Sequence, residues 1–494
     1  MNALIILSII WGSFLFIVNH GQLVEKKEVV IVGGGMAGMA AARALLNKGE
    51  YNVKVLEARS DRYGGRIWTN RQIQPGLKGV DVEMGAAFLN TRAKPNKLIK
   101  LANDFELQME NSGLLQVVTV NENGDREIYS GANATTLYTE TFKTLIEALN
   151  AAKQEITDRP VRDVFFEAVG LNGDQNEHDD ELTIVQQITK SLPAVTMQNF
   201  SSALYDIYND FGWDRILVDG VSVLLDRIVA GSGTELPVKI EMNKVVRNIK
   251  VDDKRQKVLI RTTDRKQIIA DAVVLALPVG VLKSGSVIFD PPLSRDWYKS
   301  IKSLGIDYST KIIVGFKEAF WPKDVGIFNI YSKTASDGFL QTWINSYRIS
   351  GNPVLIGKVS GEKAKLWETQ PEIERKHMVK KVLGEIFGED IVNSHDMTIF
   401  VHSNWSTDEF TLGTTSYPQV GNTPEMWKTL QQPVCPYIYF AGAHTEADTH
   451  IDSLHGAYDS GIRASQQIIN SICETKKKSA NKKQKTKSKN KDEL

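Results

Sequence analysis

Hydrophobic and polar positions predict strand, turn, helix and strand near the start of the chain. Residues 29–32, VVIV, are apolar and β-branched, which is typical of a strand buried on both faces of a parallel sheet. Residues 36–48 are rich in alanine and leucine and stop at Gly49, so they predict a helix. The segment 51–58, YNVKVLEA, predicts a second strand. The order strand, helix, strand predicts a β-α-β crossover unit of a parallel sheet.

Similar runs recur later in the chain. An apolar strand pattern occurs within 308–322, and 374–388 has apolar residues at helical spacing. In the first of these runs, Lys311 interrupts the otherwise apolar sequence KIIVGF, and a buried lysine there needs a partner or a water. With 494 residues, 42% hydrophobic and 24% charged, the chain has the composition of a folded globular protein larger than one ordinary core. We therefore expect two or three domains' worth of structure.

The two ends of the chain carry candidate targeting signals. Residues 3–18 form an apolar run that is short for a membrane span and suits the core of a signal peptide within 1–22. No lysine or arginine precedes it and no clean cleavage site follows, so an uncleaved membrane anchor is an open alternative. The last four residues, KDEL, are a retrieval signal read by a receptor. Together these features predict the endoplasmic reticulum lumen, with the KDEL receptor as a partner.

The zero net charge hides an uneven distribution of charge. Residues 476–494 carry nine lysines against Asp492 and Glu493, which leaves a mildly acidic body of 50 basic and 57 acidic residues. The tail 474–494 is too polar and repetitive to bury a core. We expect it to be a disordered, solvated spacer, and we expect no nucleic-acid partner.

Three glycines between the first strand and the helix fit the pattern G-x-G-x-x-G. Gly33 allows the tight turn, Gly35 lets the backbone approach a pyrophosphate, and Gly38 allows close packing of the helix on the strand. Glu57 ends the second strand about twenty residues further on, where a carboxylate accepts hydrogen bonds from ribose hydroxyls. Because strand, helix and acid all have the required spacing, the sequence predicts a dinucleotide site.

A second glycine motif follows this acid. Gly64, Gly65 and Arg66 allow a close backbone approach, and the arginine can hold a phosphate oxygen. With the first motif and the segment 80–90, VDVEMGAAFLN, they resemble the two-part FAD signature of the flavin amine oxidase superfamily, in which the last segment runs under the flavin ring. The resemblance continues at 240–251, 270–282, 289–294, 308–322, 403–421 and 438–465, and the chain is most like the secreted plant polyamine oxidases.

The resemblance implies an α/β flavoprotein of two domains, similar in plan to the amine oxidases and the glucose-methanol-choline oxidoreductases. A Rossmann-like FAD-binding domain is interleaved along the chain with an α+β substrate domain. On this template, 28–95, 215–290 and 435–473 form the FAD-binding domain. Residues 96–214 and 291–434 form the substrate domain.

The resemblance also implies the cofactor and its site. FAD is expected to be non-covalent, because Thr414 stands where monoamine oxidases have the cysteine that bonds to the flavin. The residues placed around FAD are Gly33, Gly35, Met36, Ala37, Gly38, Glu57, Ala58, Arg59, Gly65, Arg66, Gly85, Ala86, Ala87, Phe88, Val246, Trp405, Gly442, Ala443, Ser453 and Leu454. No recognised metal-ligand spacing is present, so we expect no metal.

Family chemistry points to one catalytic residue. A flavin amine oxidase moves a hydride from the carbon next to an amine onto flavin N5, dioxygen reoxidises the flavin to give hydrogen peroxide, and the imine hydrolyses to an aldehyde and an amine. In the family a lysine lies near N5 and bonds to it through water, and Lys311 holds that position here. The resemblance implies an FAD-dependent amine oxidase with a polyamine-like substrate, and with the amine and dioxygen as its small-molecule partners.

Several pocket positions depart from the family pattern. Family members that oxidise polyamines grip the amine between two aromatic side chains. Here the first of these positions is Thr415, with Tyr417 two residues later, and the second is near Ser453. Asn90 stands where the plant enzymes have a glutamate after the flavin segment. Ala443 replaces the glutamate of the family sequence FAGE.

These departures leave alternatives open. Asp448 or Asp452 could supply the missing charge opposite an ammonium, although a polar loop that caps the next helix explains them as well. Another superfamily enzyme, an amino-acid oxidase or a desaturase-like enzyme, is a second reading, but no arginine for a substrate carboxylate is identified. A catalytically inactive FAD-binding protein is a third, which Ala443 favours and Lys311 opposes. The patterns do not specify an oligomeric state.

Modification sites complete the sequence-based expectations. Asn133 and Asn199 begin glycosylation sequons, and a third sequon begins at Asn404. We expect Asn404 to be inaccessible, because the family template places the next residue at the flavin. The two cysteines, Cys435 and Cys473, leave one disulfide or two thiols as open alternatives.

Overall fold

A computed structural model describes residues 25–71, 81–90, 96–111, 113–120, 123–155, 157–168, 198–205, 215–231, 237–332, 340–434, 437–446 and 452–470. The N-terminal targeting segment, the lysine-rich tail with KDEL, and both cysteines lie outside these ranges. Within them, every helix is too short or too polar to cross a membrane. The expectations for the two chain ends therefore stay predictions.

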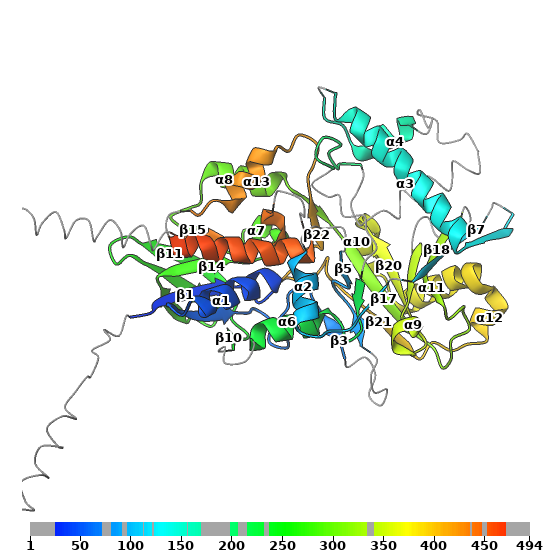
Figure 1. Cartoon of the computed structure of the whole chain (residues 1–494), viewed down its shortest axis with the longest axis horizontal. Helices are drawn as coiled ribbons and strands as arrows, with labels where there is room; N and C mark the ends of the chain where they lie inside the picture. Colours follow the sequence, from blue (N-terminus) through cyan, green and yellow to red (C-terminus); the bar gives the residue numbers. More distant parts are fainter. Residues whose placement is uncertain are drawn as a thin grey trace, which may run out of the picture.

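Two large sheets form the two halves of the molecule, on the left and the right of Figure 1. The left sheet is parallel throughout and has five strands. In spatial order these are β10 (Lys239–Glu241), β2 (Tyr51–Leu56), β1 (Lys27–Val32), β14 (Ala272–Leu275) and β23 (Ile438–Phe440). The predicted strand-helix-strand unit is β1, α1 (Met36–Lys48) and β2.

Both faces of the parallel sheet are covered, as the apolar run at its centre predicts. Val29 and Ile31 pack with α1, α6 (Val221–Ala230) and the helix 454–470. Val30 and Val32 face the opposite side. That side is covered by the strands β13 (Gln267–Ala270), β12 (Lys257–Thr262), β11 (Val246–Asp252) and β15 (Ile288–Asp290), and by the helices α7 (Val279–Ser284), α8 (Arg295–Ser303) and α13 (Pro424–Gln431).

Three helices from segments assigned to the substrate domain pack instead with the parallel sheet. Trp297 of α8 and Trp427 of α13 are fully buried in the same cluster as β1 and β14. Leu98 of α2 (Lys97–Asp104) lies in the cluster of α1 and α6. Apolar side chains of these helices need a covered face, and the parallel sheet provides it.

The right half is a seven-stranded sheet in which β7 and β18 pair in parallel and the other pairs are antiparallel. Its order is β21 (Ile399–His402), β17 (Ser309–Gly315), β20 (Val354–Ser360), β19 (Thr342–Asn345), β18 (Val325–Ser332), β7 (Leu114–Val120) and β8 (Arg126–Ser130). One face packs on the helices α10 (Glu362–Thr369), α11 (Glu372–Phe387) and α12 (Glu389–Asn393). Ile312 and Val314 point to these helices, whereas Ile313 lies on the opposite face with Val82 and Met84.

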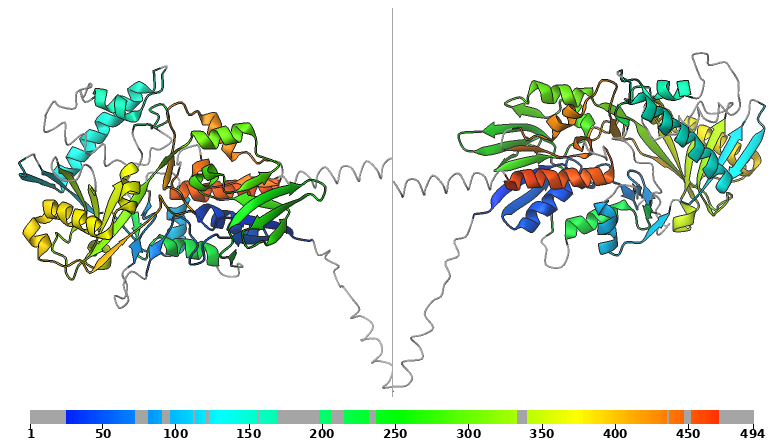
Figure 2. Two further views of the ribbon diagram at one scale, coloured as in Figure 1. Left: turned by 180° about the vertical axis from the view of Figure 1, so that it is seen from behind. Right: turned by 45° about the horizontal axis from the view of Figure 1, so that its top comes forward.

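Shorter elements join the halves or flank them. They are β3 (Thr69–Asn70), β4 (Val82–Glu83), β5 (Phe88–Leu89), β6 (Met109–Asn111), β9 (Arg215–Leu217), β16 (Gly305–Asp307), β22 (Thr415–Tyr417), α3 (Ala132–Ala152), α4 (Val161–Ala168), α9 (Tyr347–Ser350) and the 3-10 turn η2 (Ala443–Thr445). In both views of Figure 2, α3 and α4 lie beside the seven-stranded sheet and away from the parallel one. The predicted plan, an α/β dinucleotide-type domain interleaved with a second domain, is confirmed.

Candidate functional site

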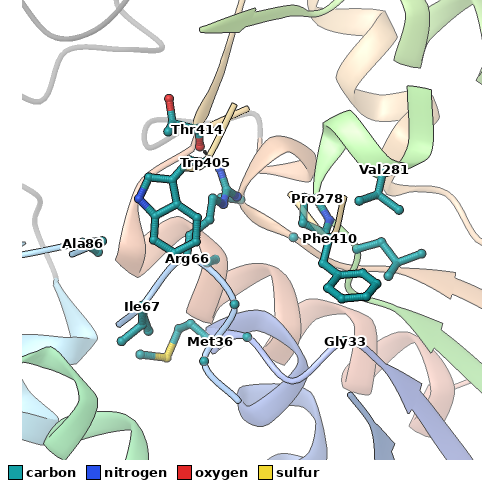
Figure 3. A pocket seen from close by; sticks show the side chains of 18 of the residues that line it. Gly33, Met36, Arg66, Ile67, Ala86, Pro278, Val281, Trp405, Phe410 and Thr414 are labelled. Atoms are coloured by element: carbon teal, nitrogen blue, oxygen red, sulfur yellow. Dashed lines mark hydrogen bonds between the residues drawn. The ribbon is translucent and has the colours of Figure 1, made fainter. Parts of the chain in front are cut away.

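A cavity of about 590 Å³ lies where the two halves meet. The turn after β1, the loop 84–88 and the C-terminal segment line it together with one face of the seven-stranded sheet. Figure 3 shows Gly33 and Met36 at one side of the cavity and Arg66, Trp405 and Thr414 across from them. The early glycine motif and the distant C-terminal segment thus close around one space, as the sequence predicts.

Glycine is required at two positions of the first motif. Gly33 has φ +108° and lines the cavity, and a Cβ there would lie 2.5 Å from the carbonyl oxygen of Ala276. A Cβ on Gly38 would lie 2.0 Å from the carbonyl oxygen of Gly33. Gly38 therefore brings α1 close to β1 and does not itself line the cavity. The N-terminus of α1 consequently opens directly onto the cavity.

Glu57 occupies the predicted place at the end of β2. Its two carboxylate oxygens accept hydrogen bonds from the backbone N–H groups of Gly34 and Arg59, each at 2.9 Å. The side chain is buried and borders the cavity. The backbone N–H of Lys244 donates to the Glu57 carbonyl at 2.7 Å, which places Val246 on the same wall.

The partly exposed Arg66 pairs with the fully buried carboxylate of Asp452, 386 positions further along the sequence. Arg66 Nη1 donates to Asp452 Oδ1 at 2.8 Å and also to the carbonyl of Thr414. The other carboxylate oxygen of Asp452 accepts from the backbone N–H of Ser416. Burial raises the pKa of Asp452, and the Arg66 charge opposes that shift. This carboxylate is therefore held by Arg66, which weakens its expected role opposite a substrate ammonium.

Lys311 links the seven-stranded sheet to the loop 84–88. Its Nζ donates to the carbonyl oxygens of Glu83, at 2.9 Å, and Gly85, at 2.6 Å. The side chain also borders the cavity. Burial lowers the pKa of Lys311 to about 8, although the Glu83 carboxylate favours the charged form. A lysine with this pKa can hold or release a proton near neutral pH.

Trp405 forms part of the cavity wall next to this loop. Its indole N–H donates to the Met84 carbonyl at 2.9 Å, and its ring meets Trp68 edge to face with centroids 6.0 Å apart. Glu368 fixes the turn that carries Trp405, because its carboxylate accepts hydrogen bonds from Ser406 and Thr407. Nothing in the sequence pattern indicated this role for Glu368.

Asn404 corrects one sequence-based expectation. Trp405 is buried, as expected, but Asn404 itself is exposed, since the turn points the two side chains in different directions. Asn133 and Asn199 are exposed too, and glycosylation at these two positions stays a prediction.

The predicted cofactor residues other than Gly38 all line the cavity, and their contacts with FAD remain predictions. Of the predicted substrate residues, Thr415 and Asp452 line it, while Asn90 and Tyr417 do not. Tyr417 packs on Phe200, with ring centroids 6.1 Å apart, and lies opposite Gly305 in the strand pair β16–β22. Tyr417, two residues further along the strand than Thr415, therefore lies beyond the end of the cavity.

The sequence analysis missed Lys358, which lines the cavity opposite Lys311 in the pairing of β17 with β20. Its signal was the same as that of Lys311, one lysine in an apolar strand pattern, VLIGKVS. Within the described ranges, no group of three or more His, Cys, Asp or Glu side chains could hold a metal ion. Asp448 lies outside these ranges.

The lining residues fit an FAD molecule. A Cβ on Gly34 would come within 2.8 Å of Glu57 Oε2, so glycine at this position lets the Glu57 carboxylate pack against the turn at the cavity edge. Four basic residues that can interact with phosphate oxygens border the same space, namely Arg59, Arg66, Lys244 and Arg247, and the first three also pair with Asp408, Asp452 and Asp264. Amide groups, an arginine and a ribose-binding acid are the donor and acceptor set that a flavin dinucleotide requires.

Comparisons with known proteins agree with this geometry. Residues 36–469 match the family model described as flavin containing amine oxidoreductase. Polyamine oxidase 5 of Oryza sativa subsp. japonica is 27% identical, with 92% of this chain and 90% of the relative covered. Polyamine oxidase 1 of Zea mays is 26% identical, with 94% of each covered.

A solved structure has the same fold. Wild-type putrescine oxidase bound to putrescine superposes with a TM-score of 0.70 at 22% identity, over 90% of this chain and 99% of that chain. The family model spans most of the chain. The protein belongs to the flavin-containing amine oxidoreductases, and it is an FAD-dependent oxidoreductase that acts on CH–NH bonds.

Proposed function

We propose that this protein is an oxidase of small amines that produces hydrogen peroxide. Bound FAD supplies the two-electron acceptor, which takes a hydride from the carbon next to the amine nitrogen and is reoxidised by dioxygen. The imine product then hydrolyses to an aldehyde and an amine. The observation that carries the proposal is Lys311, a lysine in an apolar strand that reaches the loop 84–88 at the cavity wall.

The residues of this chain position the substrate and control protons. Ile344 and Ile356 give the wall beside Lys311 an apolar surface that excludes water from the reacting carbon. With a pKa near 8, the Lys311 side chain can donate a proton as the ammonium or, as the neutral amine, accept one from a water next to the substrate. Trp405 fixes the same loop, 84–88, through the bond from its indole N–H to the Met84 carbonyl.

A peroxide assay tests the proposal. Purified protein should be yellow with bound FAD and should form peroxide with at least one member of a panel of polyamines, aromatic monoamines and amino acids. The names of the relatives put polyamines first in that panel. If no member of the panel gives peroxide, and the flavin also stays oxidised when each amine is added under anaerobic conditions, the result would favour the inactive FAD-binding alternative.

We further propose that the protein works in the lumen of the endoplasmic reticulum. The apolar N-terminal segment and the C-terminal KDEL support this location. Deletion of the last four residues should send the protein into the medium if the N-terminal segment is cleaved, and to the cell surface if it is an anchor. Cytosolic localisation of the intact chain would contradict the proposal.

A further inference from the structure

Lys358 belongs to a polar row across the cavity face of the seven-stranded sheet. In the strand pairing it lies opposite Lys311 on β17 and opposite Thr342 on β19. All three residues line the cavity. The neighbouring row on the same face is apolar and includes Ile344 and Ile356, which also line the cavity. Figure 1 shows β17 and β20 side by side in the right half of the molecule.

The two lysines of this row differ in what their ammonium groups contact. Lys311 Nζ donates to two backbone carbonyls. Among the residues that the structure describes, Lys358 Nζ has no hydrogen-bond acceptor and no carboxylate within 4.0 Å. The nearest opposing charge is Asp307, which is fully buried and attracts Lys358 from beyond that distance. Like charges directly opposite each other in a sheet are unfavourable, so an ammonium facing a cavity at this position needs an anion to offset it.

Carboxylates that line the described part of the cavity do not meet this need. Glu57 accepts from two backbone N–H groups at the far end, and Asp452 is held by Arg66. Glu409 is exposed and lies next to Phe410, whose ring faces Arg59. The sheet wall of the cavity therefore offers two lysines, Lys311 and Lys358, and the hydroxyls of Ser309 and Thr342. Burial lowers the pKa of both lysines, and a negatively charged ligand would favour their charged forms, whereas a polycation would not.

We propose that Lys358, with the Thr342 hydroxyl beside it, binds a carboxylate of the substrate. The substrate class is then an amine that also carries a carboxylate group, and Lys358 is the residue that determines this specificity. The inference rests on the proposed amine oxidase function, because it names the substrate of the same cavity.

The test compares unbranched amino carboxylates of two to six carbons with alkylamines of the same length and with 1,4-diaminobutane. At least one amino carboxylate should be oxidised with a higher kcat/KM than its matched alkylamine. Lys358→Met should lower that kcat/KM about 10- to 100-fold, the range of one charge-assisted hydrogen bond, and should change kcat/KM for the alkylamine much less. The control is Lys365→Met on α10, whose Nζ bonds to Glu362 and which does not line the cavity.

A binding measurement keeps the inference separate from turnover. Benzoate, added to the FAD-loaded protein, should perturb the flavin absorbance at lower concentration than benzyl alcohol does. Lys358→Met should abolish that preference, and Lys358→Arg should retain it. The same benzoate affinity in wild type and Lys358→Met would overturn the inference even if amines are oxidised. A protein that binds benzoate through Lys358 but oxidises no amine would instead overturn the proposed function.

Discussion

The parallel sheet and the seven-stranded sheet contribute opposite walls of one cavity, but they build them by different means. The wall at the carboxyl ends of the parallel strands consists mainly of backbone, with Gly33 to Gly35 and the first turn of α1 facing the space. The wall on the seven-stranded sheet consists of side chains, and Lys311 and Lys358 are its charged members. Two positions of the backbone wall leave little room for a side chain, because a Cβ on Gly33 or Gly34 would lie 2.5 or 2.8 Å from another protein atom. A wall of side chains can change by substitution of single residues. In this way a common cofactor site can be combined with pockets for different substrates.

The largest effect should come from the close packing of α1 on β1, which supports the backbone wall from behind. Gly38→Ala would place a Cβ 2.0 Å from the Gly33 carbonyl oxygen, so we expect little soluble protein and no retained FAD. Gly49→Ala is the matched control. Its Cβ would meet no atom within 4 Å, and its φ of +77° should cost only about 1 kcal/mol. The absorbance of bound flavin per protein measures the FAD content of both variants. Normal FAD content in Gly38→Ala would contradict the difference between the two walls.

Lys311→Met should have the largest effect on the side-chain wall. We expect flavin reduction by an amine, or its reoxidation, to slow by about 100-fold or more, with FAD content unchanged. Lys317→Met tests the same substitution on an exposed lysine just past the end of β17 and should leave the rates unaltered. Stopped-flow spectroscopy measures both half-reactions. Unaltered rates in Lys311→Met would remove this lysine from the mechanism.

Arg66 supports the junction between the two walls. Arg66→Met should leave the buried Asp452 carboxylate without its cation and lower the free energy of unfolding by about 3 kcal/mol. Arg71→Met removes an arginine whose pair with Asp81, at 3.4 Å, is largely solvent-accessible, and should cost less than about 1 kcal/mol. Urea denaturation of the FAD-loaded variants compares the two. Equal losses would show that the Arg66 pair is no more than a surface interaction.

The pH dependence of stability sharpens the account of Lys311. Burial places its pKa near 8 in the folded protein, below the ordinary lysine value of 10.5. Between these values the unfolded chain binds more protons at this site than the folded protein does, so its contribution to stability rises with pH from about 8 to 10.5. Wild type should therefore gain stability relative to Lys311→Met across that window. Melting temperatures of both proteins at pH 7 to 10 measure this, and parallel curves would mean an unshifted pKa.

The smallest effects concern the missing aromatic cage. Tyr417 lies beyond the cavity, so Tyr417→Phe should change kcat/KM for any amine substrate by less than about twofold. Thr415 does line the cavity, and Thr415→Tyr should lower KM for an amine about two- to fivefold through a cation–π contact. Steady-state kinetics measures both variants. A larger effect of Tyr417→Phe than of Thr415→Tyr would place the cage position at Tyr417.

Sequence reasoning succeeded where local backbone geometry dictates the residue. Gly33 and Gly38 were assigned their roles from spacing alone, because a positive φ and a close packing distance admit one residue type. Glu57 followed, since its distance from the glycines is fixed by the length of α1 and β2. Lys311 was assigned from the family resemblance, and its place as the one charge in an apolar strand supported the assignment.

The remaining features depend on contacts between distant segments. Lys358 becomes part of the site only through its pairing with β17, and Arg66 meets Asp452 across most of the chain. Tyr417 was assigned to the cavity because spacing along a strand does not tell where the cavity ends. Asn404 was expected to share the burial of Trp405, and a turn separated the two side chains. None of these follows from a local pattern.

The last contributors to the cofactor site are made late in synthesis. Ala443 and Ser453 line the same space as Gly33, and a Cβ at Gly461 would lie 2.2 Å from the carbonyl of Ala37, so the C-terminal helix seats directly on α1. Nearly the entire polypeptide must therefore be synthesised before the flavin-binding site is complete. A chain that ends before β23 leaves the apolar edge of β14 unpaired. Chaperones, and not added cofactor, would then be needed to keep such a chain from aggregating.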